Sequence, residues 1–172
     1  DLTDVTVADL HGALLKHQVL FFRDQAFDLD SLSAFGRCFG EPHTHPSHPD
    51  EPGHHGVMAF HTDAKSKTYG GRKWHSDVTC DVEPPMASIL HLHAVPETGG
   101  DTLFANMCAA YEALSPTLQD MLGGLTAHHS SEANFLGYYG AKGDDLRDGN
   151  YPEAEHPVVR THPETGQKAL FV

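Results

Sequence analysis

The sequence predicts an α+β fold in which short helices and short strands follow one another within a single domain. Several segments open with a Thr, Asp or Ser cap and then repeat apolar residues at a spacing of three or four, which indicates helices. Other short runs are apolar or alternating and are bounded by Gly and Pro, which is typical of strands. With 172 residues, the chain is long enough to bury a core of its own.

The balance of charge argues against two classes of partner. There are 24 acidic and 11 basic residues, and the formal net charge of -13 disfavours a nucleic acid or an anionic membrane surface. No apolar stretch approaches the roughly 18 residues of a membrane span. The three cysteines include no C-x-x-C pair, which indicates reduced thiols and a cytoplasmic location.

Two helices are predicted in the N-terminal part of the chain. Thr6 can cap a helix over roughly 7–16, whose apolar residues recur on one face. A short buried strand is expected at 19–22. Asp28 can cap a second helix, which ends where Gly40 follows its last apolar residue.

Residues 41–71 are rich in Pro, Gly and His, which favours an ordered loop with a possible strand at 57–60. The loop contains His43, His45 and His48. Because His-x-His also occurs in zinc hydrolases, a zinc site at these three histidines is one hypothesis. The alternative is that they are solvated or contact a substrate, since several of them stand beside Pro.

The pair His75 and Asp77 carries the main functional hypothesis. In an extended strand, residues i and i+2 project to the same side, so this imidazole and this carboxylate would meet at one point. They would supply two ligands of the 2-His-1-carboxylate triad that holds non-haem Fe(II). His91 and His93, in a strand predicted over 87–95, repeat the spacing and are the rival pair; we expect them to fill the faces of that strand.

The C-terminal half is predicted from caps, turns and apolar alternation. The expected elements are a strand beginning at Thr102, a helix over 107–114, a helix opened by Ser115-Pro116, a strand over 125–130, and a hairpin of 158–161 with 168–172. Between 131 and 151, Gly and Asp cluster, which favours a flap over a core element.

Several motifs follow one another in a definite order: WHSDVT at 74–79, PP at 84–85 and GGDT at 99–102. They resemble the taurine dioxygenase family of Fe(II)- and 2-oxoglutarate-dependent oxygenases. Segments similar to that family also occur at 17–25, 39–41, 110–115 and 156–163, so the resemblance covers nearly the whole chain. It implies a double-stranded β-helix, or jelly roll, with flanking helices. It also implies that O2 and 2-oxoglutarate are consumed, with succinate and CO2 as products.

The resemblance assigns His75 and Asp77 as iron ligands and Thr102 as a contact to 2-oxoglutarate. The second iron histidine and the arginine that binds 2-oxoglutarate lie, in the family, beyond the point where this chain stops. His156 and His162 are not substitutes, because the family has both in addition to the later ligand. We therefore expect residues 1–172 to form a single incomplete domain, with C-terminal jelly-roll strands missing and no activity alone.

The resemblance also places substrate contacts at six positions: His45, His48, Gly71, Asn134, Phe135 and Phe171. His45 matches the histidine that meets the sulfonate in taurine-cleaving relatives. His48 and Gly71 stand where a tyrosine and an asparagine would be expected, so the expected substrate is a small anion such as a sulfonate, an alkyl sulfate or a carboxylate. A catalytically inert metal- or anion-binding fragment remains an alternative, and a homo-oligomer is possible.

Overall fold

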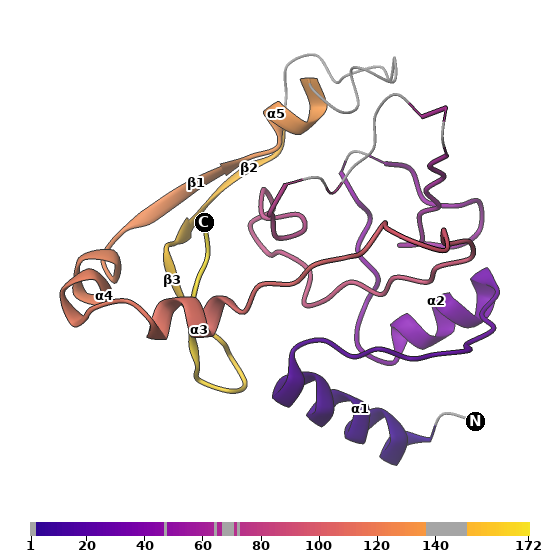
Figure 1. Cartoon of the computed structure of the whole chain (residues 1–172), viewed down its shortest axis with the longest axis horizontal. Coiled ribbons are helices and arrows are strands. Elements are labelled where there is room, and N and C mark those ends of the chain that lie inside the picture. The colour runs from indigo at the N-terminus through magenta and orange to yellow at the C-terminus, as the bar shows by residue number, and fades with distance from the viewer. Residues whose placement is uncertain (1–2, 47, 64, 67–70, 72, 137–150) are drawn as a thin grey trace. The chain divides into compact units, whose positions relative to one another are not determined.

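The computed structural model describes residues 3–46, 48–63, 65–66, 71, 73–136 and 151–172 (Figure 1). Its contacts divide the chain into two compact units. The first comprises Asp1–Ala59 and Ile89–Ala94, and the second comprises Phe60–Ser88 and Val95–Val172. Helices and antiparallel strands both occur, which agrees with the predicted α+β class. The expectation of a single domain stays a prediction.

The first helix of the first unit, α1, spans Asp4–His17 and begins earlier than predicted. Its N-cap is Thr3, whose hydroxyl oxygen accepts a hydrogen bond of 3.2 Å from the Thr6 backbone N–H. The prediction that Thr6 is the cap was therefore wrong. Asp4 then lies in the first turn, where its negative charge interacts favourably with the helix dipole, and this favours the earlier start.

The second helix, α2, spans Leu29–Arg37 and starts at the predicted cap. Asp28 accepts a hydrogen bond of 2.8 Å from the Ser31 N–H, and the Ser31 hydroxyl bonds back to the Asp28 N–H at 2.9 Å, forming a capping box. Phe35 on this helix stacks near Phe27, with ring centroids 5.6 Å apart. The His91 ring meets the edge of Phe27, so His91 fills this apolar face as predicted.

Two short helices of the second unit were predicted correctly. Helix α3 spans Met107–Glu112 and helix α4 spans Pro116–Leu122. Ser115 caps α4 by accepting a hydrogen bond from the Leu118 N–H, and Pro116 occupies the first turn. Both helices therefore form where local capping chemistry predicts them.

Two antiparallel strand pairs complete the second unit, and Figure 1 shows the longer one as an extended ribbon. Strand β1 (Thr126–Ser130) pairs with β2 (Glu153–Pro157), and β3 (Val159–Thr161) pairs with β4 (Lys168–Leu170). Strand β1 and the β3–β4 hairpin were predicted, whereas β2 was not. A short helix, α5 (Glu132–Asn134), follows β1 within the predicted flap, whose residues 137–150 lie outside the described residues.

The largest buried apolar side chains of this unit gather around the β1–β2 pair. Phe135 is 4% exposed and Val158 is 7% exposed, with Ala154 and Cys80 also buried. Phe135 packs against Tyr151, with ring centroids 5.5 Å apart. This small core supports the end of β1 and the beginning of β2.

Four predicted strands are not formed. Residues 19–22, 57–60 and 87–95, and the segment from Thr102, contain no strand, although all of them are described. An extended backbone becomes a strand only when a neighbouring strand pairs with it along a ladder of hydrogen bonds, and no described strand pairs with these segments. Apolar side chains in these segments are accordingly exposed, for example Phe21, Leu90, Leu92 and Leu103. Among the described helices, none is long and apolar enough to cross a membrane.

Candidate metal site

The side chains of His75 and Asp77 lie against each other, although the backbone does not form the predicted strand. Residues 74–76 are irregular and a turn occupies 77–80. His75 Nε2 lies 3.4 Å from Asp77 Oδ1, and both side chains are about half exposed, at 53% and 55%. The prediction that the two groups meet at one point is therefore correct, but its structural reason is a turn rather than the alternation of a strand.

The hydrogen bond at the other ring nitrogen fixes which side of His75 faces Asp77. His75 Nδ1–H donates to the Lys73 carbonyl oxygen at 2.6 Å. In the neutral imidazole, Nε2 then carries a lone pair and no hydrogen. Histidines that bind metals commonly donate their second ring N–H to a backbone carbonyl in this way.

The Asp77 carboxylate is oriented as well. The Ser88 hydroxyl donates a hydrogen bond of 2.7 Å to Asp77 Oδ2, which leaves Oδ1 facing His75. A lone pair on Nε2 and a carboxylate oxygen repel each other unless a proton or a metal cation lies between them. Metal bonds to imidazole nitrogen and carboxylate oxygen measure about 2.0–2.2 Å, so one cation can reach both atoms. The donor set and its spacing fit a divalent metal ion.

The turn that follows Asp77 is strained. Val78 has a φ of 50°, in the left-handed region that a β-branched residue rarely adopts. Such a conformation costs about 1–2 kcal/mol. The Asp81 N–H closes the turn by donating to the Val78 carbonyl at 3.1 Å. Strain of this kind persists where surrounding contacts hold the backbone, and it often lies beside functional residues.

No third ligand joins this pair in the part of the chain that the structure describes. Within those residues, no group of three His, Cys, Asp or Glu side chains is placed to hold a metal ion. The hypothesis of a zinc site at His43, His45 and His48 was therefore wrong. His162 does not serve as a ligand either, because its Nδ1 accepts hydrogen bonds from the Glu164 and Thr165 N–H groups.

The predicted 2-oxoglutarate contact, Thr102, is exposed in an extended segment that precedes α3. Asn134 is also exposed, whereas Phe135 is buried in the small core described above. Phe171 stacks on His129, with ring centroids 5.1 Å apart, and lies under the Arg160 guanidinium at 4.5 Å. The binding roles of these residues stay predictions.

The loop that contains His45 is held by its own hydrogen bonds in the first unit. His48 N–H donates to the His45 carbonyl at 3.4 Å, so the two predicted substrate contacts occupy one turn. Near them, Asp50 Oδ2 accepts hydrogen bonds from the Thr44 hydroxyl at 3.1 Å and from His55 Nδ1–H at 2.9 Å. These contacts tie both ends of the loop to Asp50.

The surroundings of Asp50 favour the ionised form of its carboxyl group. Burial favours its neutral form, but hydrogen bonds from the Gly56 N–H and His55, among others, outweigh burial and lower its pKa.

Gly71, the remaining predicted substrate contact, is exposed in the second unit, with a φ of 74° and open space where a Cβ would lie.

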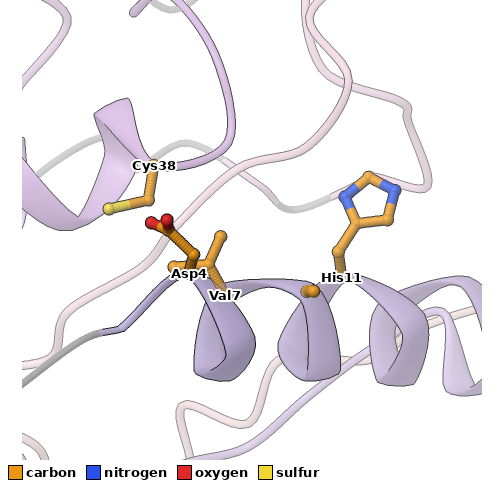
Figure 2. A pocket seen from close by; sticks show the side chains of 5 residues that line it. Asp4, Val7, His11 and Cys38 are labelled. Atoms are coloured by element: carbon orange, nitrogen blue, oxygen red, sulfur yellow. The ribbon is translucent and has the colours of Figure 1, made fainter.

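A shallow pocket of the first unit is lined by residues of α1 and by the C-cap residue of α2. Figure 2 shows Asp4, Val7 and His11 of α1 beside Cys38, the C-cap residue of α2. None of the residues assigned to metal, co-substrate or substrate lines it. The pocket therefore adds nothing to the site.

Sequence reasoning missed two groups that orient the metal pair: the Ser88 hydroxyl and the Lys73 carbonyl. Neither has a sequence signal, because Ser88 lies eleven residues from Asp77 and a carbonyl group is present at every position. Sequence reasoning also gave no role to His156, which was considered only as a possible ligand. Its buried position could have been suspected from the alternation of Ala154 and His156 with Glu in β2.

Comparison with known proteins gives a consistent result. The family described as "Taurine catabolism dioxygenase TauD, TfdA family" matches residues 1–172. An alpha-ketoglutarate-dependent sulfate ester dioxygenase from Pseudomonas putida is 36% identical over 99% of this chain and 58% of its own length. An alkylsulfatase from Acinetobacter baylyi is 38% identical over 100% of this chain and 56% of its own length.

A solved structure agrees with these relatives. The crystal structure of a taurine dioxygenase from Burkholderia xenovorans superimposes with a TM-score of 0.77 and 34% identity, covering 99% of this chain and 55% of that one. The chain therefore spans a little over half the length of these relatives.

Proposed function

The chain belongs to the TauD/TfdA family of dioxygenases, and from this membership we propose that it carries part of an Fe(II)- and 2-oxoglutarate-dependent active site. The reaction would couple the decarboxylation of 2-oxoglutarate to the hydroxylation of a small anionic substrate by O2. A metal ion bound here would supply a centre that binds O2 and 2-oxoglutarate next to the substrate. The observation that carries the proposal is the facing pair His75 Nε2 and Asp77 Oδ1.

The residues of this chain would act before any chemistry by fixing the position of the cation. His75 presents Nε2 because its Nδ1–H is bound to the Lys73 carbonyl, and Asp77 presents Oδ1 because Ser88 binds Oδ2. Thr102 would donate its hydroxyl proton to a carboxylate of 2-oxoglutarate. A third metal ligand and a cation for the far carboxylate of 2-oxoglutarate would have to come from residues outside the described set.

We assign the substrate to small anions, with alkyl sulfates and sulfonates first. This assignment is supported by the names of two relatives, a sulfate ester dioxygenase and an alkylsulfatase. In this chain, His45 would bind the anionic group, and the hydrogen bonds around Asp50 would keep its loop in place. A carboxylate substrate remains within the same proposal, because a carboxylate presents similar acceptor oxygens.

We further propose that the described strands belong to a jelly roll, as in the family, and that strands outside the described set would complete it. The exposed apolar side chains of 87–95 support this, because an extended segment with Leu90 and Leu92 exposed is suited to pairing with further strands. No disulfide joins Cys38, Cys80 and Cys108, which is compatible with a cytoplasmic location.

The proposal is tested by anaerobic addition of Fe(II) and 2-oxoglutarate to the complete protein. A visible charge-transfer band is expected when 2-oxoglutarate chelates the bound iron, and the band should be absent in a His75→Ala variant. Decarboxylation of 2-oxoglutarate is then followed with alkyl sulfates, sulfonates and carboxylates as substrates. A complete protein that binds Fe(II) but gives neither the band nor succinate would be an inert metal-binding protein, and the proposal would fail.

A further inference from the structure

His156 makes the contact that joins strand β2 to the turn after Asp77. It lies in β2, where Ala154 and His156 are buried while the intervening residues are exposed. Its Nε2 lies 3.0 Å from the Thr79 carbonyl oxygen and 2.9 Å from the Asp81 carbonyl oxygen. Since both partners are acceptors, Nε2 carries a hydrogen and donates to the two carbonyls in a shared hydrogen bond.

The turn that His156 holds is the turn after Asp77, which contains the strained residue Val78. Val78, with its φ of 50°, stands between Asp77 and the two carbonyls that His156 binds. Cys80, between those carbonyls, is buried. The carbonyls of Thr79 and Asp81 are thus attached to β2, and these two hydrogen bonds help to hold Val78 in its strained conformation.

The ring of His156 is itself held firmly. It meets the edge of Phe171 at a centroid distance of 5.2 Å and the edge of His129 at 5.2 Å. Its backbone lies opposite Ala127 in the strand ladder. A side chain that is 5% exposed and packed against two rings cannot rotate away from the turn without disrupting this cluster.

From this geometry we propose that His156 is a positioning residue for the metal site: it holds the turn at 78–81 so that Asp77 Oδ1 stays against His75. The inference rests on the proposed metal site of His75 and Asp77. His156 touches neither of these two side chains in the described contacts, and it acts through the backbone that carries Asp77.

The test compares His156→Leu with His129→Leu in the complete protein, with Mn(II) as the probe and metal affinity measured by titration. His129 is the matched control, because it is buried in the same aromatic cluster but has no hydrogen bond to the turn. We expect His156→Leu to weaken Mn(II) binding about tenfold or more, as is typical when groups that orient metal ligands are removed. His129→Leu should change the affinity by less than this, because the hydrogen bonds from His156 to the turn remain.

A second comparison does not depend on the folding of the leucine variant. In His156→Gln, the side-chain amide can place an N–H near the position of Nε2, whereas in His156→Asn the shorter side chain cannot. We expect Gln to keep Mn(II) affinity near that of the unchanged protein and Asn to lose it in part. Equal affinities in the Gln and Asn variants, or equal losses for His156→Leu and His129→Leu, would overturn the proposal.

The His75→Ala variant distinguishes failure of the proposed metal site from failure of the positioning role of His156. If His75→Ala binds Mn(II) as tightly as the unchanged protein, the proposed metal site itself fails. If His75→Ala loses binding but the substitutions of His156 have no effect, only the positioning role of His156 fails.

Discussion

The Ser88 hydroxyl donates a hydrogen bond of 2.7 Å to one carboxylate oxygen of Asp77, so only the other oxygen faces His75. This relationship makes Ser88 a determinant of metal binding. In Ser88→Ala, the carboxylate is free to rotate, and we expect Mn(II) affinity to fall by about tenfold without a large loss of stability. Metal titration of the complete protein, together with thermal unfolding, checks this.

Ser66→Ala is the matched control for that substitution. Ser66 also donates its hydroxyl to an aspartate, Asp63, at 3.1 Å, but this pair is not part of the metal site. The control should leave Mn(II) affinity unchanged. Equal effects of the two substitutions would show that Ser88 has no special role.

Gly56→Ala is expected to destabilise the loop that contains His45. Gly56 has a φ of 76°, and a Cβ here would collide with the Pro42 side chain and lie 3.2 Å from the Pro42 Cα. Gly53→Ala is the control, because Gly53 has a similar φ of 82° but open space around it. Both variants have backbone strain of about 1–2 kcal/mol, and only Gly56→Ala adds about 1–3 kcal/mol of overpacking. Denaturant unfolding measures the difference, and equal losses would contradict the predicted contact.

Substitution of His45 is expected to separate substrate binding from the reaction of 2-oxoglutarate. If His45 binds the anionic group, His45→Ala should raise KM for an alkyl sulfate about tenfold or more, since a hydrogen bond to a charged group contributes about 1.5–3 kcal/mol. Decarboxylation in the absence of substrate should be nearly unchanged. His61→Ala, at an exposed histidine, is the control. Parallel loss of both activities would point instead to a structural or metal-binding role for His45.

The stability of the protein should decrease in acid partly because of His129. Burial is the main cause of its lowered pKa, and the nearby His156 adds to the effect. When the pH falls below 6.5, the ordinary pKa of histidine, His129 becomes protonated in the unfolded chain while it is still neutral in the folded protein. The free energy of unfolding therefore falls as the pH falls. Melting temperatures at pH 7.5 and 5.5 should differ less in His129→Leu than in the unchanged protein. An identical difference in both proteins would rule out this contribution.

Helices were predictable from the sequence where capping is local, and strands were predictable only in part. The caps Asp28 and Ser115 act on residues within one turn, so their helices form as predicted. Strand β2 was missed because Glu153-Ala154-Glu155-His156 lacks β-branched residues, and its pairing with β1 decides its conformation. The segments 19–22 and 87–95 have the composition of strands, but no described strand pairs with them.

The candidate metal site shows the same difference between local features, which could be predicted, and long-range contacts, which could not. The pair His75 and Asp77 could be predicted from two positions in one motif. The contact from His156 to the Thr79 carbonyl could not, because it joins residues 77 positions apart and depends on the pairing of β2. Sequence patterns therefore locate ligands that are close in the chain, whereas the groups that orient them depend on tertiary packing.

The last prediction concerns the 172-residue chain by itself, which we expect to bind Mn(II) or Fe(II) weakly and to sustain little turnover. His75 and Asp77 are two donors, and no third joins them among the described residues. Two protein ligands hold a divalent cation less tightly than the three of a facial triad, and they restrict its orientation less. The relatives that this chain matches are nearly twice as long, so residues outside the matched part are available to complete their sites. The chain should be supplied with Fe(II), ascorbate and 2-oxoglutarate, and succinate should be measured against a His75→Ala control. Sustained formation of succinate above that control would show that the 172 residues already contain a complete site, and the two-ligand interpretation would be wrong.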